Sequence, residues 1–224
     1  NGLSDVVQLA AQKQMRSERM RTELITNVSH DIKTPLTSII NYVDLLQKPH
    51  SQEEGEKYLE VLSRQSARMK RLIDDLIELS KASTGNIPLE LTRIDAVEAV
   101  NQALGEFTDK LKAAGLTPLF RQPEEPLYIH ADGRLLWRAM SNLLSNAVKY
   151  AQPGTRLYID MVAVDKKVCI SLKNISRDPL NISAEELMER FVRGEASRNQ
   201  EGSGLGLNIA KSVMELQHGA LELL

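Results

Sequence analysis

Apolar and polar residues recur along the first part of the chain with the period of a helix. From about residue 3 to residue 47, apolar side chains return every three or four positions, with no glycine and a single proline, Pro35. This pattern predicts one very long helix that bends at Pro35, because proline removes a helical hydrogen bond. One stripe of the helix lies roughly opposite His30, so the imidazole should point away from the core. The stripe consists of Val28, Ile32, Leu36, Ile39, Val43 and Leu46.

A second helix follows a polar break at residues 48–51 and runs to about Ala82. Ser51 can cap this helix, with Glu54 three positions later completing a capping box. Its apolar stripe consists of Leu59, Leu62, Met69, Leu72, Ile73, Leu76 and Leu79. Two helices alone cannot bury both stripes. Pairing two copies of the hairpin in a four-helix bundle would bury them, so we expect a homodimer.

The pattern changes after the small polar linker at residues 83–86. Short alternating segments predict strands near residues 87–92, 116–121, 127–131, 155–164 and 167–175. Helical periodicity predicts helices near residues 95–113, 132–151, 184–191 and 204–218. Helices combined with mostly antiparallel strands indicate an α+β sandwich. We therefore expect two domains, a helical hairpin over residues 1–83 and an α/β sandwich over residues 87–224.

Composition narrows the classes of function. The 224 residues are 42% apolar and carry a net charge of −2 with acidic and basic residues interspersed, which argues against nucleic-acid binding. The single cysteine, Cys169, cannot form an internal disulfide, and we expect it to be a buried strand residue. No apolar run is long enough to span a membrane and no signal-peptide pattern opens the chain, so we expect a cytoplasmic fragment of a longer protein.

The segment around His30 has a distinctive sequence. Thr34 and Asn41 lie near His30 on the helix surface, so a polar strip surrounds the imidazole. A neutral imidazole attacks phosphorus well when its other nitrogen donates a hydrogen bond, and Asp31 can supply the acceptor. Residues 27–36, Asn-Val-Ser-His-Asp-Ile-Lys-Thr-Pro-Leu, closely resemble the H-box of sensor histidine kinases. The resemblance implies that His30 accepts the phosphoryl group, that Asp31 is its general base and that Thr34 orients water for phosphatase action.

A second motif follows Asp132-Gly133-Arg134. Asn142, Asn146, Lys149 and Tyr150 fall on one stripe of the predicted helix, which can face a ligand. The alternative is that the asparagines are buried and form hydrogen bonds with each other. Residues 142–150 resemble the N-box of the same family, which implies that Asn146 offers its side-chain oxygen to Mg²⁺ and that Asn142 lies near the phosphates. Lys149 would then meet phosphate and Tyr150 would border the nucleotide.

Glycines precede the last predicted helix, whose N-terminus could hold phosphates. Glycine-rich runs are often only flexible turns, but this one resembles the second glycine box of the family and consists of Gly202, Ser203, Gly204, Leu205, Gly206 and Leu207. Residues 189–193 resemble the F-box, which implies that Phe191 anchors the lid over the nucleotide. Arg193 and Arg198 are candidates for phosphate contact, although surface solvation explains either equally well.

The first glycine box departs from the family pattern. The family has an aspartate that accepts a hydrogen bond from the adenine amino group, and Asn174 stands at that position. The Asn174 amide oxygen can still accept this bond, but its NH₂ group cannot replace the second carboxylate oxygen. Ser176 and Asp178 replace two expected glycines, which restricts the backbone. The alternative is that this segment no longer contacts nucleotide.

Together these motifs identify the chain as similar to the sensor histidine kinases of two-component systems. The resemblance implies a dimeric phosphotransfer hairpin followed by a Bergerat-type ATP-binding domain, with ATP and Mg²⁺ as cofactors. It also implies transfer of phosphate from His30 to an aspartate in the receiver domain of a response regulator, and a parent protein anchored in the bacterial membrane through segments absent here. Two alternatives remain open, a weak or phosphatase-dominated kinase and a non-catalytic docking scaffold.

Overall fold

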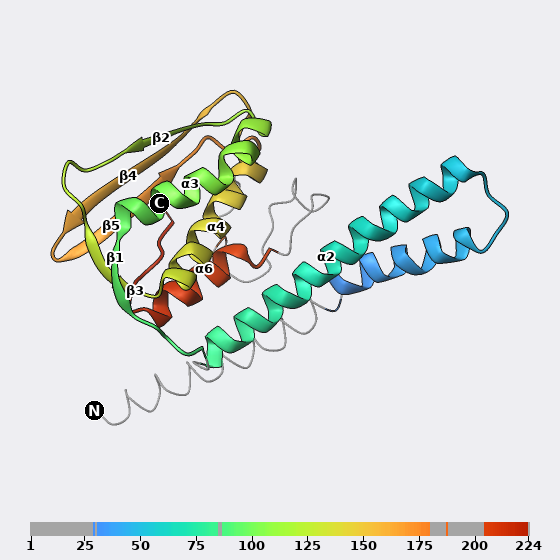
Figure 1. Ribbon diagram of the computed structural model, residues 1–224, viewed down its shortest axis with the longest axis horizontal. Coiled ribbons are helices and arrows are strands. Elements are labelled where there is room, and N and C mark those ends of the chain that lie inside the picture. The colour runs from blue at the N-terminus through green and yellow to red at the C-terminus, as the bar shows by residue number, and fades with distance from the viewer. Residues whose placement is uncertain (1–28, 30, 85–86, 180–186, 188–203, 224) are drawn as a thin grey trace. The chain divides into compact units, whose positions relative to one another are not determined.

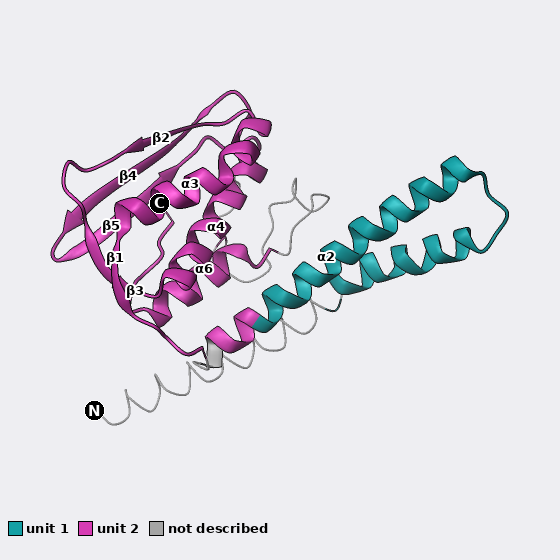
Figure 2. Ribbon diagram, in the orientation of Figure 1, with its two compact units in different colours: residues 1–77 teal, residues 78–224 magenta. Residues whose placement is uncertain are grey.

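The computed structural model describes residues 29, 31–84, 87–179, 187 and 204–223. The chain divides into two compact units, residues 1–77 and residues 78–224, which are coloured separately in Figure 2. The first unit is helical and the second combines helices with sheets, as the sequence predicted. The domain boundary expected at residues 83–87 stays a prediction. No helix in the described part of the chain has both the length and the hydropathy needed to cross a membrane.

The first unit is a helical hairpin (Figure 1). A helix over residues 31–46 is followed by a short turn and by α2 (Gln52–Thr84), whose last residues belong to the second unit. The predicted capping box is present, because the Ser51 backbone N–H donates to Glu54 Oε2 at 2.8 Å and the Glu54 N–H donates to Ser51 Oγ at 3.3 Å. The rings of Tyr42 and Tyr58, with centroids 5.6 Å apart, join the two helices near the turn.

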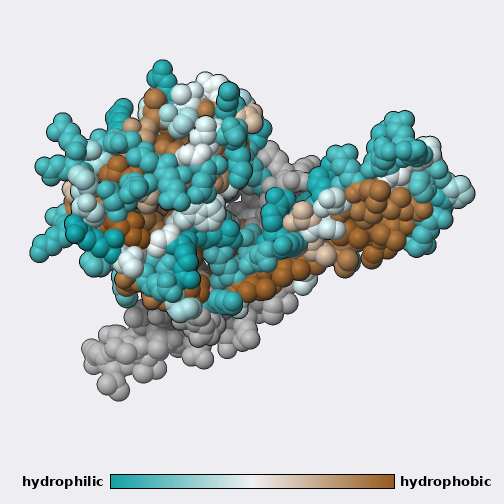
Figure 3. Space-filling model, in the orientation of Figure 1, coloured by the Kyte–Doolittle hydropathy of each residue, from teal (hydrophilic) through white to brown (hydrophobic). Residues whose placement is uncertain are grey.

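Large apolar side chains stay exposed on the hairpin, and Figure 3 shows hydrophobic surface on this unit. Their exposed fractions are 42% for Leu36, 53% for Ile40, 39% for Val43, 58% for Leu59, 39% for Ile73 and 47% for Ile77. Several of them belong to the two predicted stripes. A single copy of the hairpin therefore does not bury its own apolar surface, which is the physical basis on which a dimer was expected.

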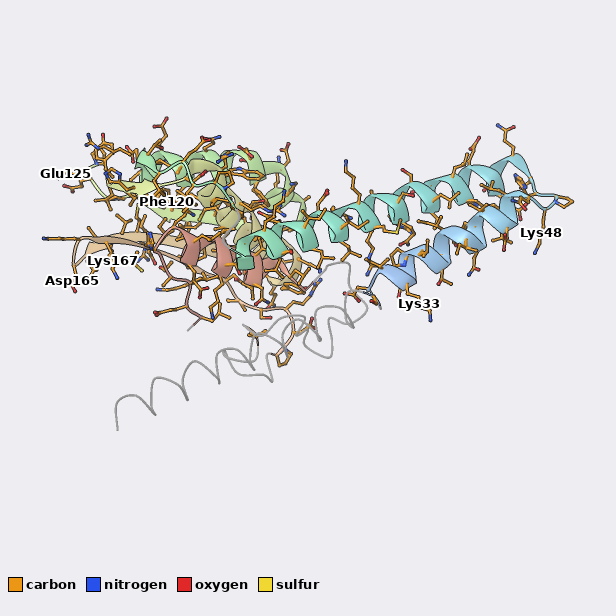
Figure 4. The ribbon with its side chains drawn as sticks, turned by 90° about the horizontal axis from the view of Figure 1, so that it is seen from below. Lys33, Lys48, Phe120, Glu125, Asp165 and Lys167 are labelled. Atoms are coloured by element: carbon orange, nitrogen blue, oxygen red, sulfur yellow. The ribbon has the colours of Figure 1, made fainter. Side chains whose placement is uncertain are left out.

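Two small sheets form the strand layer of the second unit. β1 (Thr92–Asp95) pairs antiparallel with β3 (Tyr128–Ala131), as a two-stranded sheet. β2 (Thr117–Arg121) pairs parallel with β4 (Arg156–Val164), which pairs antiparallel with β5 (Lys167–Lys173). The β4–β5 hairpin turns at Asp165 and Lys166, whose φ values are 47° and 62°, and Figure 4 labels Asp165 and Lys167 at its tip.

Helices cover one face of the three-stranded sheet. α3 (Ala96–Ala113) and α4 (Gly133–Tyr150) pack on it, and α6 (Gly206–Leu216) packs against α4 (Figure 1). The core between these layers is apolar and includes Val100, Phe107, Leu111, Met140, Leu144, Leu157, Ile159 and Met161. The outer sheet face stays exposed, with Val162 at 51% and Val164 at 54%. The predicted α/β sandwich is therefore confirmed.

Two expectations from the sequence are wrong. The strand predicted near residues 87–92 instead lies at β1, because the Glu90 N–H donates to the Asp132 carboxylate at 3.0 Å rather than to a strand. Cys169 is in a strand but is exposed, because Val168 and Ile170 take the face that packs on the core and Cys169 takes the other. The helix predicted near residues 184–191 lies outside the described residues except for Leu187.

Candidate functional site

α4 carries the asparagine motif. Its apolar side faces the core through side chains that include Met140, Leu144 and Ala147, all buried. This packing leaves Asn142 and Asn146 half-buried on the helix. The Asn142 Nδ2 donates to the Arg138 carbonyl one turn earlier at 3.0 Å, which orients the amide. The side-chain oxygen of Asn142 is therefore held in place rather than left to rotate.

Asp132 fixes the start of α4. Its side chain is 1% exposed and caps the helix by accepting the Arg134 N–H at 3.0 Å and the Leu135 N–H at 3.4 Å. The Arg134 guanidinium also donates to both carboxylate oxygens, at 3.2 Å from Nε and at 2.9 Å from Nη2. Hydrogen bonding by Arg134 is the main reason that the pKa of Asp132 falls from 3.8 to about 2. The carboxylate is thus charged at neutral pH despite its burial.

α6 brings the second glycine box against the asparagines. A Cβ atom on Gly206 would lie 3.2 Å from Asn142 Oδ1, so that amide would have to shift by a few tenths of an ångström, whereas the 3.8 Å to Asn146 Oδ1 is ordinary van der Waals contact. Gly204 has φ +67°, which favours glycine. The N-cap residue of α6, Leu205, makes no side-chain capping hydrogen bond. The N-terminus of α6 lies beside two amide oxygens, and the N-terminus of a helix generally favours anions.

The segment at residues 174–178 lies against the other end of α4. Ala151 forms an antiparallel bridge with Ser176, and the Arg177 N–H donates to the Tyr150 carbonyl at 2.9 Å. Lys149 Nζ lies 4.8 Å from the centroid of the Tyr150 ring, and both side chains are half-buried. The Asn174 side chain is exposed. The segment in which the family's first glycine box is altered therefore lies next to the backbone of Lys149 and Tyr150.

The donor set suits Mg²⁺ only in company with phosphates. In the described residues, no group of three or more His, Cys, Asp or Glu side chains could hold a metal ion. The candidate ligands are instead the amide oxygen of Asn146 and, beside it, that of Asn142, which are the hard oxygen donors that Mg²⁺ prefers. Mg²⁺ is commonly bound by one or two protein oxygens together with substrate phosphates and water. Asn146 therefore fits the role of a single protein ligand to a nucleotide-bound metal.

The histidine motif is described only in part. Asp31 is half-buried and Thr34 is exposed in the helix over residues 31–46, and Pro35 is buried. Several predicted site residues lie outside the described residues and have no structural account here, namely His30, Phe191, Arg193, Gly202 and Ser203. The site that the structure assembles is thus α4, the start of α6 from Gly204 onward, and residues 174–178.

Sequence reasoning missed two contributors to this site. One is the pair of Asp132 and Gln217, in which the Asp132 N–H donates to Gln217 Oε1 at 2.7 Å and ties the start of α4 to the end of α6. The other is Arg177, which contacts the end of α4 through side chain and backbone. An aspartate before a predicted helix signals a cap, but nothing in the sequence marks these partners, because they are far apart along the chain.

Family comparisons agree with the two units. Residues 20–85 match the His Kinase A (phospho-acceptor) domain, and residues 131–223 match the histidine kinase-, DNA gyrase B- and HSP90-like ATPase family. The first match contains His30, and the second contains the asparagine motif and both glycine segments. The two matched segments together account for most of the chain.

Curated relatives point to the same family. The chain is 27% identical to sensor histidine kinase YcbM of Bacillus subtilis over 92% of its own length and 68% of the relative. It is 31% identical to the sensor protein VanS of Enterococcus faecium, over 98% of the chain and 57% of VanS. It is 28% identical to the sensor protein kinase WalK of Staphylococcus epidermidis, over 93% of the chain but only 35% of WalK. The chain therefore spans only part of the relatives it matches.

Solved structures share the fold. Histidine kinase ThkA, solved in complex with response regulator protein TrrA, matches with a TM-score of 0.72 at 22% identity, over 94% of this chain and 60% of that one. Full-length ShkA in complex with AMPPNP matches with a TM-score of 0.63 at 20% identity, over 90% of this chain and 42% of that one. With the phospho-acceptor hairpin followed by the ATPase domain, the chain belongs to the sensor histidine kinases, the protein-histidine kinases of two-component systems.

Proposed function

We propose that this chain binds Mg-ATP, phosphorylates its own His30 and passes the phosphoryl group to an aspartate of a response regulator. The observation that carries the ATP half of this proposal is the contact of Gly206 with Asn142 and Asn146. Two motifs from distant parts of the sequence meet there, one with oxygen donors and one with a helix N-terminus suited to phosphate. Neither would need that proximity in a docking scaffold.

Different residues of this site would bind different parts of the nucleotide. The N-terminus of α6 and Lys149 would hold the phosphates, and Asn146 would hold Mg²⁺. When bound, Mg²⁺ neutralises charge that develops on the phosphate oxygens during transfer. Tyr150, at the C-terminus of α4, and Asn174, in the segment that pairs with this end, would border the base. This assignment uses the order of the residues along α4, from Asn142 through Asn146 to Tyr150, to set the direction of the nucleotide.

The phosphoryl transfer needs a neutral imidazole. One ring nitrogen of His30 attacks the γ-phosphorus, the bond from that phosphorus to the bridging oxygen breaks, and the electron pair leaves with ADP. The proton on the other ring nitrogen is held by an acceptor, and Asp31 is the adjacent carboxylate in the sequence. The match of residues 20–85 to the phospho-acceptor family supports His30 as the acceptor.

Two partners complete the proposal. A second copy of this chain would cover the exposed apolar side chains of the hairpin, which include Ile40 and Leu59. A response regulator would receive the phosphoryl group, and the likeness to ThkA, which was solved with its regulator TrrA, supports a partner of that class. The family match to a phospho-acceptor domain supports the same assignment.

We also propose phosphatase action toward the phosphorylated regulator. Thr34 is exposed on the hairpin helix and can position a water molecule, but it cannot take a proton from His30. A phosphatase-dominated regulator is the second candidate function, and the replacements at Asn174, Ser176 and Asp178 favour it because they weaken the expected adenine contacts. The variant Thr34→Ala should keep autophosphorylation while losing dephosphorylation of the regulator. Equal loss of both activities would point instead to a structural role near Pro35.

Radiolabelled ATP tests the main proposal directly. The purified chain with Mg²⁺ and γ-labelled ATP should gain a label that is stable in base and lost in acid, as expected for phosphate on imidazole. His30→Gln should abolish the label. His130→Gln is the matched control, because His130 is an exposed histidine in β3, and this variant should label like wild type. A label that survives His30→Gln would show that another residue is the acceptor.

A further inference from the structure

The segment at residues 174–178 is fastened to the end of α4 by an organised set of hydrogen bonds. The Gln152 N–H donates to the Ile175 carbonyl at 2.8 Å, and the Arg177 N–H donates to the Tyr150 carbonyl at 2.9 Å. These two bonds flank the bridge between Ala151 and Ser176. The Arg177 side chain adds a third bond, from Nη2 to the Lys149 carbonyl at 2.7 Å. Segment and helix end therefore move together.

Arg177 completes the C-terminus of α4. A helix leaves its last four carbonyls without helical partners. At this end the Ala147 carbonyl accepts from the Ala151 N–H at 2.9 Å. Arg177 donates to two more carbonyls, from its side chain to that of Lys149 and from its backbone to that of Tyr150. The guanidinium also places positive charge at the negative end of the helix dipole. An anionic nucleotide near this helix end would otherwise meet unfavourable partial charge, which Arg177 and Lys149 together offset.

The sequence of this segment explains why the Arg177 side chain helps to join it to α4. Ser176 and Asp178 occupy positions at which the family has glycines, so the backbone cannot use the conformations that glycine alone adopts. The Ser176 hydroxyl donates to the Asp178 carbonyl at 2.8 Å, which closes the segment on itself. Arg177, between these two residues, then joins the closed segment to α4. Backbone hydrogen bonds to α4 and the side chains of Ser176 and Arg177 therefore hold the segment, instead of glycine turns.

We propose that Arg177 is a positioning residue of the nucleotide site, which holds the base-side segment at residues 174–178 in register with Lys149 and Tyr150. The proposal rests on the proposed function, since it concerns the same ATP site. Arg177 acts through its neighbours and takes no part in phosphoryl transfer. Loss of its side chain should lower the fraction of the protein whose segment is ready to receive nucleotide, and apparent affinity falls in proportion to that fraction.

The test compares two variants with a matched control in the whole chain. Arg177→Met keeps the aliphatic length of the side chain but removes its charge and donors, and Arg177→Lys keeps a cation that can reach a carbonyl. Calorimetric titration with Mg-ATP should show binding weakened about three- to tenfold by Arg177→Met, in line with the loss of one charged helix cap, and less by Arg177→Lys. The control Arg156→Met removes an exposed arginine at the start of β4 and should bind ATP like wild type.

Two further readouts separate positioning from a general loss of structure. In autophosphorylation assays, Arg177→Met should raise the KM for ATP by more than it lowers kcat, whereas a damaged fold would reduce both. Without nucleotide, hydrogen exchange at the amides of Gln152 and residue 177 should become faster, because the bridge with α4 is loosened.

The outcomes are distinguishable. If wild type binds ATP and Arg177→Met binds it equally well, the positioning role is wrong while the proposed function stands. If wild type binds no ATP, the proposed function fails and this inference fails with it. Should Arg177→Met lose its fold, Arg177→Lys decides the question. Affinity for Mg-ATP that is measurable but weaker than that of wild type supports the positioning role. Affinity equal to that of wild type, with unchanged hydrogen exchange, overturns it.

Discussion

The buried carboxylate of Asp132 should contribute a pH-dependent part of the stability of the ATPase unit. Asp132→Asn replaces one carboxylate oxygen by an NH₂ group and removes the charge. In the native structure the two oxygens accept from the Glu90 and Arg134 backbones and from the Arg134 guanidinium. In the variant, the NH₂ group of asparagine would point at one or more of these donors, and two donors cannot form a hydrogen bond. A buried donor without a partner lowers the free energy of unfolding.

The structure gives the size of this effect. Hydrogen bonding, chiefly by Arg134, lowers the pKa of Asp132 from 3.8 to about 2. At about 1.4 kcal/mol for each pKa unit, this difference corresponds to about 2.5 kcal/mol of stability in favour of the charged folded state. The Arg134 side chain is 64% exposed, so solvent screens part of its attraction, and we expect about 1–2 kcal/mol.

The sign follows from the lowered pKa. The folded state binds its proton more weakly than the unfolded state, so the contribution is fully present above the unfolded value of 3.8 and is lost as pH falls toward about 2. The pH-dependent part of the stability difference between wild type and Asp132→Asn should therefore shrink by about half between pH 6 and pH 3. Comparing the two proteins at each pH cancels the titration of other groups that both share.

Urea unfolding followed by tryptophan fluorescence measures this difference. Trp137 is the single tryptophan of the chain and lies in α4, so its emission reports on the unit that contains Asp132. Asp95→Asn is the matched control, because Asp95 caps α3 through the Val97 N–H at 2.9 Å. Asparagine caps helices about as well as aspartate, so this control should cost only a few tenths of a kcal/mol. A difference for Asp132→Asn that is the same at pH 6 and pH 3 would refute the reasoning.

Three further predictions concern the site and the dimer. Gly206→Ala should weaken Mg-ATP binding at least about tenfold in calorimetry, because its Cβ would crowd Asn142 Oδ1 at 3.2 Å, whereas Gly105→Ala, with nothing within 4 Å, should bind as wild type does. Leu59→Glu, at a side chain 58% exposed on the hairpin, should shift the chain from dimer to monomer in analytical ultracentrifugation, and a wild type that is already monomeric would contradict this. Asn174→Asp should tighten ATP binding by about 1–3 kcal/mol if Asn174 contacts adenine, and the double variant with Asp178→Gly removes the competing carboxylate; affinities that stay flat across the set would show that this segment does not touch nucleotide.

Local sequence patterns determined most of the elements and the identity of the motifs. The capping box of Ser51 and Glu54 was readable because both partners lie within one helical turn. The common stripe of Asn142 and Asn146 was readable for the same reason, since helical periodicity alone places both on one side of α4. The apolar stripes of the hairpin also showed in the sequence, and with them the expectation of a second copy.

Only the tertiary structure decided which distant residues meet. Gly206 lies against Asn142, and Gln217 binds the backbone of Asp132, across separations that no local period encodes. The exposure of Cys169 was misjudged because alternation along a strand reveals two faces but not which one the helices cover. No sequence pattern marks Arg177, and its hydrogen bond to the Lys149 carbonyl exists only because packing brings the two segments together. These features depend on packing between elements, and packing follows from the whole apolar surface of the chain rather than from any single segment.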